Sequence, residues 1–183
     1  MEAIKKIVVI GPESTGKSTL CRKLAEYYNT LWVPEYAREY LLTNGRDYTY
    51  ENLLAIAKGQ LASEDEYLKN SKFKIENSKL FIDTDMYVMK VWCEFVFNKC
   101  HNWILNRIAE GKYDGYLLCN TDIDWVKDAL REYPDTETRH KLYYYYKDLM
   151  INQDVPWVDI SGDYATRFEK AINFIENKCM AGP

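Results

Sequence analysis

Short apolar stretches alternate with longer amphipathic ones along the whole chain. Stretches of strand length lie at 4–10, 31–34, 80–83, 116–120 and 156–160. The spacing of apolar positions predicts helices ending near residues 28, 42, 69, 98, 110, 150 and 177. Asn44-Gly45 breaks one helical pattern, and Thr49 is placed to cap the next helix. Strands alternating with helices predict an α/β domain with a five-stranded, mainly parallel sheet.

Composition and charge exclude several classes of protein for this chain. The 183 residues, 47% hydrophobic and 28% charged, suit one domain with a single core. The net charge is −4 and no long basic run occurs, so we expect no nucleic-acid partner. We also expect no membrane association, because no apolar run is long enough, and no targeting segment in residues 1–6. Five scattered cysteines without a CxxC pair predict reduced thiols in the cytoplasm rather than a zinc site.

A glycine-rich loop follows the first predicted strand. Residues 11–18, Gly-Pro-Glu-Ser-Thr-Gly-Lys-Ser, fit the pattern GxxxxGK[ST] at every fixed position. Glycines let backbone N–H groups approach phosphates, Lys17 supplies charge to the β- and γ-phosphates, and Ser18 binds magnesium. The residues expected to contact ATP are Gly11, Glu13, Ser14, Thr15, Gly16, Lys17, Ser18 and Thr19. ATP and Mg²⁺ are therefore the expected cofactors, and the alternative is a loop that only turns the chain.

Two acids follow the third predicted strand. Asp83 ends the run Leu80-Phe81-Ile82, and a second acid at this place in a phosphate-loop site orders magnesium. The alternative for Asp83 is an N-cap of the next helix. Asp85 could hold ribose hydroxyls or take a substrate proton, and its alternative is an acid favoured by the dipole of that helix.

A carboxylate and an arginine follow the second predicted strand. Glu35 is a candidate base for a substrate hydroxyl, with Asp85 as the other candidate, and Arg38 could neutralise developing charge. The alternative for Glu35 and Arg38 is a surface ion pair. Because a carboxylate and an arginine at this place suit a substrate hydroxyl, they favour a kinase acting on a small molecule.

The charged stretch after the fourth predicted strand carries Arg131 and Arg139. It predicts a lid over about 121–139 whose arginines reach the transferring phosphate and whose closure excludes water. Arg131 is the candidate catalytic arginine of this lid, and the alternative for the stretch is a solvated charged helix. Candidates for holding a flat cationic ring are Tyr36, Tyr87, Trp92 and Trp125. The alternative for each of these aromatic residues is a place in the core.

Taken together, these motifs resemble the ribosylnicotinamide kinase domain at the C-terminus of NadR-type bacterial NAD-biosynthesis proteins. The resemblance covers nearly the whole chain. It rests on the loop at 11–19, Val-Pro-Glu-Tyr-Ala-Arg-Glu-Tyr at 33–40, Phe-Ile-Asp-Thr-Asp at 81–85, Asp-Ile-Asp-Trp-Val-Lys-Asp-Ala-Leu-Arg at 122–131, and Ser-Gly-Asp-Tyr at 161–164 with Arg167-Phe168.

The resemblance implies a P-loop kinase of the nucleoside/nucleotide-kinase branch. Such an enzyme transfers the γ-phosphate of ATP to the 5′-hydroxyl of nicotinamide riboside and makes nicotinamide mononucleotide. Residues 33–38 are also similar to deoxynucleoside kinases, in which the matching glutamate is the base, so the resemblance supports Glu35. The loop carrying Gly162 and Tyr164 would lie against adenine. Substrate contacts are expected from Glu35, Tyr36, Arg38, Asp85, Tyr87, Trp92 and Trp125.

Trifunctional members of that family carry a DNA-binding segment and an adenylyltransferase domain before the kinase. The resemblance of these 183 residues is to the kinase alone, so kinase activity alone is expected. Two alternatives stay open, namely another P-loop nucleoside or nucleotide kinase and a regulatory ATPase module. Glu35, Arg38 and the lid argue against the module, because a pure switch does not require them. The oligomeric state does not follow from the sequence.

Overall fold

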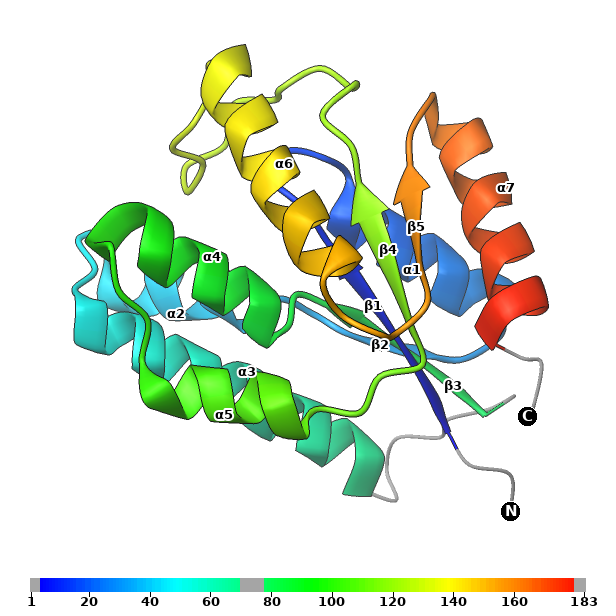
Figure 1. Cartoon of the computed structure of the whole chain (residues 1–183), viewed down its shortest axis with the longest axis horizontal. Helices are drawn as coiled ribbons and strands as arrows, with labels where there is room; N and C mark the ends of the chain where they lie inside the picture. Colours follow the sequence, from blue (N-terminus) through cyan, green and yellow to red (C-terminus); the bar gives the residue numbers. More distant parts are fainter. Residues whose placement is uncertain (1–3, 70–77, 180–183) are drawn as a thin grey trace.

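The computed structural model describes residues 4–69 and 78–179 (Figure 1). Its strands are β1 (Lys5–Ile10), β2 (Leu31–Val33), β3 (Lys79–Asp83), β4 (Gly115–Cys119) and β5 (Trp157–Ile160). Its α-helices are α1 (Lys17–Tyr27), α2 (Tyr36–Asn44), α3 (Tyr50–Lys69), α4 (Met86–Phe97), α5 (Asn102–Glu110), α6 (Thr136–Ile151) and α7 (Tyr164–Phe174). The predicted alternation of strands and helices is therefore confirmed.

The strands form one sheet in the order β2-β3-β1-β4-β5, and every neighbouring pair is parallel. Strand β1 lies in the centre, where Val8 is in register with Ile82 of β3 and Tyr116 of β4. A central parallel strand is covered on both faces, which explains why β1 carries a continuous apolar run. The carboxyl ends of all five strands consequently meet at one edge of the sheet.

Successive residues of β1 face two separate cores. Ile7 and Val9 pack with α1 and α7 on one face of the sheet, whereas Val8 and Ile10 pack with α4 and α6 on the other. In Figure 1, α6 lies in front of the sheet and α1 lies behind it. This alternation follows from the two-residue period of a strand.

A third core lies beside the sheet, among α2, α3, α4 and α5. Leu53, Ile56, Met89 and Ile104 are fully buried there. These helices pack on one another more than on the strands, and they build the wall that faces the carboxyl end of β1. The third core therefore fixes the position of α2 and α4 relative to the loop after β1.

Several helix ends confirm the sequence-based expectations. The Thr49 hydroxyl accepts from the Asn52 amide at 3.3 Å and caps α3, and α2 ends at Asn44 before Gly45. The last helix differs from expectation, because α7 ends at Phe174 and the chain continues as one π-helical turn, Ile175–Cys179. That turn buries Cys179 against Gly115, where an added Cβ would lie 2.5 Å from the Cys179 sulfur. Because Gly115 has no side chain, the Cys179 sulfur of the π-helical turn fits against it.

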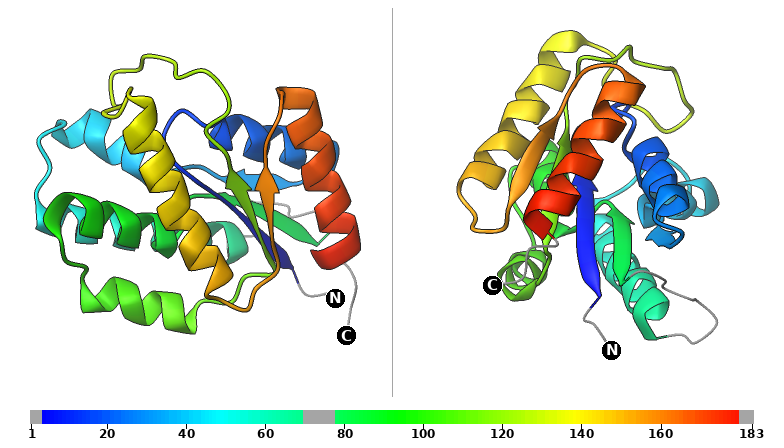
Figure 2. Two further views of the ribbon diagram at one scale, coloured as in Figure 1. Left: turned by 45° about the horizontal axis from the view of Figure 1, so that its top comes forward. Right: turned by 90° about the vertical axis from the view of Figure 1, so that its right-hand side faces the viewer.

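The stretch between β4 and α6 has no helix or strand before Thr136. Figure 2 shows it as a long yellow-green loop beyond the carboxyl end of the sheet. A solvated helix, one reading of this stretch, is therefore wrong for residues 121–135. We call residues 121–139 the lid segment. Across 4–69 and 78–179, no helix combines the length and the apolar character needed to cross a membrane.

Candidate active site

The glycine-rich loop lies between the carboxyl end of β1 and the first turn of α1. At Gly11 the backbone has φ +136°, and an added Cβ would lie 2.6 Å from the Cys119 carbonyl oxygen. Gly16 has φ +79° and directly precedes Lys17, the first residue of α1. Both positions need glycine, because other residues rarely adopt such angles. The loop thereby directs the N-terminus of α1 toward any bound phosphate.

Lys17 lies folded across its own loop. Its ammonium donates to the Pro12 carbonyl at 2.8 Å, and the Thr15 hydroxyl donates to the same oxygen at 2.7 Å. These bonds hold the loop in a tight turn and keep the lysine charge next to the backbone amides. The loop therefore provides a ready site for an anion.

Asp83 and Ser18 come together because β3 and β1 are neighbouring strands. The Ser18 hydroxyl donates to Asp83 Oδ2 at 2.5 Å. Asp83 is fully buried, and among the described residues its Oδ1 accepts no hydrogen bond. Burial, followed by the negative charge of Glu35, raises the pKa of Asp83 to about 7, while Lys17 and the Ser18 hydrogen bond oppose the shift.

A hydroxyl and a carboxylate with an unpartnered oxygen form a hard oxygen donor set, which fits Mg²⁺. No cluster of three or more His, Cys, Asp or Glu side chains in 4–69 and 78–179 could hold a metal. Magnesium needs no such cluster in a phosphate site, because one or two protein groups and the phosphates suffice. Ser18 and Asp83 would hold the ion, which would supply charge neutralisation to bound phosphates.

The N-cap of α4 is Asp85 rather than Asp83. Asp85 Oδ1 accepts from the amides of Tyr87 at 2.9 Å and Val88 at 3.4 Å. Its Oδ2 accepts from the Tyr116 hydroxyl at 2.8 Å. Burial raises the pKa of Asp85 to about 6, and these hydrogen bonds oppose the shift. Both oxygens of Asp85 thus serve the fold, and the residue does not line the cavity described next.

A cavity of ≈ 250 Å³ opens beside the glycine-rich loop. Its walls come from that loop, α2, α4, α6, the lid segment and the chain between α2 and α3. The side chains that line it outside the glycine-rich loop are Glu35, Ala37, Arg38, Leu41, Tyr48, Val88, Val91, Trp92, Phe95, Leu130, Arg131, Glu132, Tyr133, Leu142 and Tyr146. One end is polar and adjoins the loop, whereas the remainder is largely apolar and aromatic.

Glu35 lies in this cavity at the carboxyl end of β2. It occupies the N-cap position of α2, yet its side chain caps no amide. Within the described residues its carboxylate has no hydrogen-bond or ion-pair partner. A half-buried carboxylate without a partner remains available to accept a proton from a bound hydroxyl.

Arg38 lines the same cavity but pairs with the lid segment. Its guanidinium donates to both oxygens of Asp128, at 3.2 and 2.9 Å. This paired hydrogen bond holds the pKa of Asp128 at about 2. The alternative to a catalytic role, a surface ion pair of Glu35 with Arg38, is therefore wrong, because Arg38 pairs with Asp128 and ties α2 to the lid segment.

Glu13 anchors the lid segment to the glycine-rich loop. Its carboxylate accepts from the Trp125 indole at 3.2 Å and from the amides of Glu132 at 2.9 Å and Tyr133 at 2.6 Å. Hydrogen bonds to an ionised group are about twice as strong as neutral ones. Glu13 occupies one of the unspecified positions of the GxxxxGK[ST] pattern. Its hydrogen bonds set the position of the lid segment, which the pattern alone does not predict.

Further bonds hold the lid segment against the loop. The Val126 amide donates to the Ser14 hydroxyl at 2.9 Å, and Arg131 donates to the Val126 carbonyl. Arg139 is buried and donates to the carbonyls of Ile123 at 3.1 Å and Ser14 at 3.4 Å. Arg131 therefore lines the cavity from the lid segment, while Arg139 braces the base of that segment.

We expect Glu13→Ala to release the lid segment. Amide hydrogen exchange at Glu132 and Tyr133 should accelerate about tenfold, since each loses a charged acceptor. The amide of Thr138, held by Asp135 at 2.7 Å, provides an internal reference. Exchange measured by NMR or mass spectrometry checks this, with Glu26→Ala as a matched exposed acid on α1. Unchanged exchange at Glu132 and Tyr133 would show that Glu13 does not hold the lid segment.

Three of the four predicted aromatic contacts lie outside the cavity lining. Tyr36 packs against Gly59, where an added Cβ would lie 2.0 Å from its ring, so it belongs to the third core. Tyr87 stacks edge-on with Tyr116 at 5.7 Å. Trp125 reaches Glu13 rather than the cavity. For Tyr36 and Tyr87, the structure thus favours the core over a ligand-binding place.

Trp92 lines the cavity, as predicted for a site residue. Its indole donates to the Tyr48 hydroxyl at 2.9 Å, and that hydroxyl donates to Glu132 at 3.0 Å. The aromatic residues that the sequence reasoning missed are Tyr48, Phe95, Tyr133 and Tyr146. Tyr48 lies between two helices and Tyr146 within a run of four tyrosines, and neither lies in one of the motifs that carry the candidate catalytic residues.

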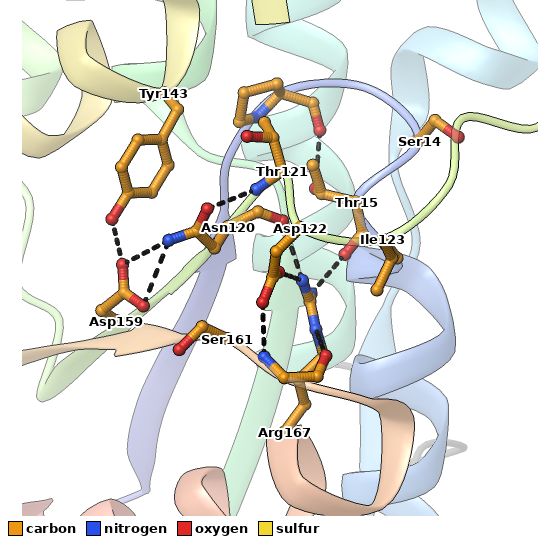
Figure 3. Close-up of polar contacts among 12 residues, drawn as sticks. Ser14, Thr15, Asn120, Thr121, Asp122, Ile123, Tyr143, Asp159, Ser161 and Arg167 are labelled. Atoms are coloured by element: carbon orange, nitrogen blue, oxygen red, sulfur yellow. Dashed lines mark hydrogen bonds and ion pairs between the residues drawn. The ribbon is translucent and has the colours of Figure 1, made fainter. Parts of the chain in front are cut away.

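The loop after β5 lies near the glycine-rich loop, and the Arg167 side chain bonds to carbonyls of both loops (Figure 3). Gly162 has φ +101°, and its amide donates to Asp122 at 2.6 Å. The ring of Tyr164 covers Gly16, where an added Cβ would lie 3.4 Å away, and Lys23 lies 5.9 Å from that ring. Gly162 and Tyr164 are therefore beside the phosphate-binding loop, as their expected role requires.

Comparison with known proteins places this site in context. The trifunctional NAD biosynthesis/regulator protein NadR of Escherichia coli (strain K12) is 27% identical over 177 residues, which are 94% of this chain and 42% of that protein. The chain thus spans less than half the length of this relative. A crystal structure of NadR in complex with NR superposes with a TM-score of 0.81 at 22% identity, over 98% of this chain and 52% of that one.

Two further structures share the fold. NadR in complex with NAD and AMP-PNP gives a TM-score of 0.72 at 21% identity, over 98% of this chain and 51% of that one. A structure of deoxyadenosine kinase from M. mycoides gives a TM-score of 0.62 at 13% identity, over 93% of this chain and 98% of that one. A family model described as an AAA domain matches residues 6–167, from β1 through the glycine-rich loop and the lid segment to Arg167. The chain therefore belongs to this AAA-domain family of P-loop proteins.

Proposed function

We propose that this protein is an ATP-dependent kinase that phosphorylates the 5′-hydroxyl of nicotinamide riboside and yields nicotinamide mononucleotide. The observation that carries the proposal is one cavity that joins the phosphate-binding loop to the unpartnered carboxylate of Glu35. A phosphoryl acceptor in that cavity would have its hydroxyl between a base and the donor phosphate. The similarity to NadR over 94% of the chain supports the riboside as acceptor.

The residues of the chain divide the work between holding charge and moving a proton. The loop amides and Lys17 bind the phosphates of ATP, and Ser18 with Asp83 hold the magnesium site. Glu35 accepts the proton of the attacking 5′-hydroxyl. Arg131, carried on the lid segment at the cavity wall, faces the charge that develops on the transferred group. Positioning and charge stabilisation are the main demands of phosphoryl transfer.

The remainder of the cavity suits a flat cationic ring. Trp92 and Phe95 provide aromatic surface, and Glu35 and Glu132 add negative charge at the rim. A positively charged pyridinium ring gains from both, through cation–π attraction and through charge. Arg38 is neutralised by Asp128 and therefore does not repel such a ring. This chemistry favours nicotinamide riboside over an uncharged nucleoside.

The proposal assigns the chain as one kinase domain with the lid segment at 121–139. The lid segment already lies on the phosphate-binding loop through Glu13 and Ser14, which supports its role in excluding water. We place the reaction in the cytoplasm, on a small-molecule substrate, with neither nucleic acid nor a membrane involved. The buried free cysteines Cys21, Cys93, Cys119 and Cys179 agree with a reducing compartment.

An ADP-release assay with ATP, Mg²⁺ and a panel of ribosides tests the function. We expect strong stimulation by nicotinamide riboside and a product that co-migrates with nicotinamide mononucleotide. Stimulation only by other nucleosides would support kinase activity but show that the proposed acceptor is wrong. Slow ATP hydrolysis that no riboside changes would instead favour a regulatory ATPase.

A further inference from the structure

The proposed reaction gives no task to Arg167, a residue of the motifs on which the resemblance rests. It lies in the first turn of α7, next to the core that α1 and α7 share with the sheet. Only 3% of its surface is exposed. Burying a charge costs free energy unless partners compensate it, so the contacts of this guanidinium indicate why it is there.

The guanidinium of Arg167 binds four acceptors (Figure 3). Its Nε donates to the Gly162 carbonyl at 2.8 Å, and Nη1 donates to the Thr15 carbonyl at 2.9 Å. Its Nη2 donates to the Asn120 carbonyl at 2.9 Å and also pairs with Asp122. Four of the five donors of an arginine are thus in use.

These acceptors come from separate segments that would surround a nucleotide bound as proposed. Thr15 belongs to the phosphate-binding loop, and Gly162 belongs to the loop expected beside the base. Asn120 directly follows β4, and Asp122 is the second residue of the lid segment. Asp122 completes the connection, because its second oxygen accepts from the Gly162 amide at 2.6 Å. One side chain therefore ties the phosphate end of the site to the base end.

A second set of bonds fixes the Asn120 anchor. The Asn120 side chain donates to Asp159 at 3.1 Å and accepts from the Thr121 amide at 2.7 Å. Asp159 also accepts from the Tyr143 hydroxyl of α6 (Figure 3). The carbonyl that Arg167 contacts consequently belongs to a residue held by β5 and α6. Arg167 thus binds to a rigid frame rather than to a free loop.

From this geometry we propose that Arg167 is a positioning residue for ATP. It holds the phosphate-binding loop and the loop at 161–163 at a fixed separation, so that the triphosphate and the base bind at the same time. The inference rests on the proposed use of ATP, but not on the identity of the acceptor. A buried ion pair adds little stability compared with an apolar residue of the same size, which favours a role in geometry.

Arg167→Lys tests this role, because lysine keeps the charge but loses the planar set of donors. Binding of Mg·ATP and of Mg·tripolyphosphate is measured by titration calorimetry, without any acceptor. Tripolyphosphate engages only the phosphate end. We expect the Kd for ATP to rise about tenfold, with a change below about threefold for tripolyphosphate. Arg22→Lys, an exposed arginine on α1, is the matched control and should leave both unchanged.

Asp122→Asn provides a milder second variant, because the Asp122 side chain is 38% exposed and the fold tolerates its change more easily. It should raise the Kd for ATP in the same direction, about threefold, and add little to Arg167→Lys in a double variant. Equal losses for ATP and tripolyphosphate would overturn the proposal, because Arg167 would then act on the phosphate loop alone. Unchanged ATP binding with a lower melting temperature would also overturn it. A parent protein that binds no ATP would refute the proposed function itself.

Discussion

Replacing Glu35 with glutamine should lower kcat for riboside phosphorylation by about 10² to 10⁴-fold, the range that a general base contributes. Glutamine keeps the size of the side chain but cannot take the proton of the 5′-hydroxyl. ATP binding should stay within about twofold, because among the described residues Glu35 makes no hydrogen bond or ion pair with the glycine-rich loop. Steady-state kinetics and calorimetric ATP binding measure the two effects separately.

Glu39→Gln on the exposed side of α2 is the matched control for Glu35→Gln. It removes the same charge from the same helix and should leave kcat unchanged. A kcat of Glu35→Gln close to that of the parent would remove Glu35 as the base. Asp85→Asn should instead lower stability, because Asp85 caps α4 and accepts from Tyr116. A loss of kcat in Asp85→Asn without a loss of stability would favour Asp85 as the base.

The sequence predicts best the features that local chemistry dictates. The apolar run of β1 and the glycine pattern after it determine the strand, the loop and the start of α1 without help from distant residues. The place of Asp83 follows almost as directly, because parallel strands end at one edge of the sheet. The pairing of Ser18 with Asp83 is a consequence of β1 and β3 being neighbours. Once the order of the strands is known, these residues can be placed together in one site.

Other residues could not be placed from sequence because their partners are far away in the chain. Tyr36 has the spacing of a ligand-binding aromatic residue, but Gly59 of α3 leaves a space that its ring fills. Asp85 has the spacing of a second catalytic acid, but a hydroxyl 31 residues away, on Tyr116, takes its free oxygen. Glu13 was expected to contact ATP, whereas in this structure it binds donors more than 110 residues away.

The lid segment shows how such distant contacts give the site its shape. Arg38 of α2 and Glu13 of the phosphate loop bind different parts of it, through Asp128 and through the amide of Tyr133. Each contact pairs an ionised side chain with a partner at the cavity rim. Charged side chains thus help to set the position of the lid segment in this structure.

Asp83→Asn should separate activity from stability. The neutral amide is a poor magnesium ligand, so kcat should fall about 10²-fold or more at saturating Mg²⁺. The free protein should nevertheless become more stable at pH 8, by on the order of 1–3 kcal/mol. The buried charge of Asp83 and its repulsion by Glu35 disappear, while the amide oxygen still accepts from Ser18. Urea unfolding in EDTA measures the stability, and kinetics measure kcat.

The pH dependence gives this prediction its sign. Because the folded pKa of Asp83 is raised to about 7, the folded protein holds a proton there that the unfolded chain has already released. The stability that this bound proton contributes to the folded state is fully present below the unfolded pKa of about 4, and it is lost as the pH rises through about 7. The gain in stability from Asp83→Asn should therefore be small near pH 4 and largest above pH 7. Asp65→Asn, an exposed acid on α3, is the control. A gain that does not vary with pH would mean that the pKa of Asp83 is the same in the folded and unfolded states, which would contradict the raised pKa.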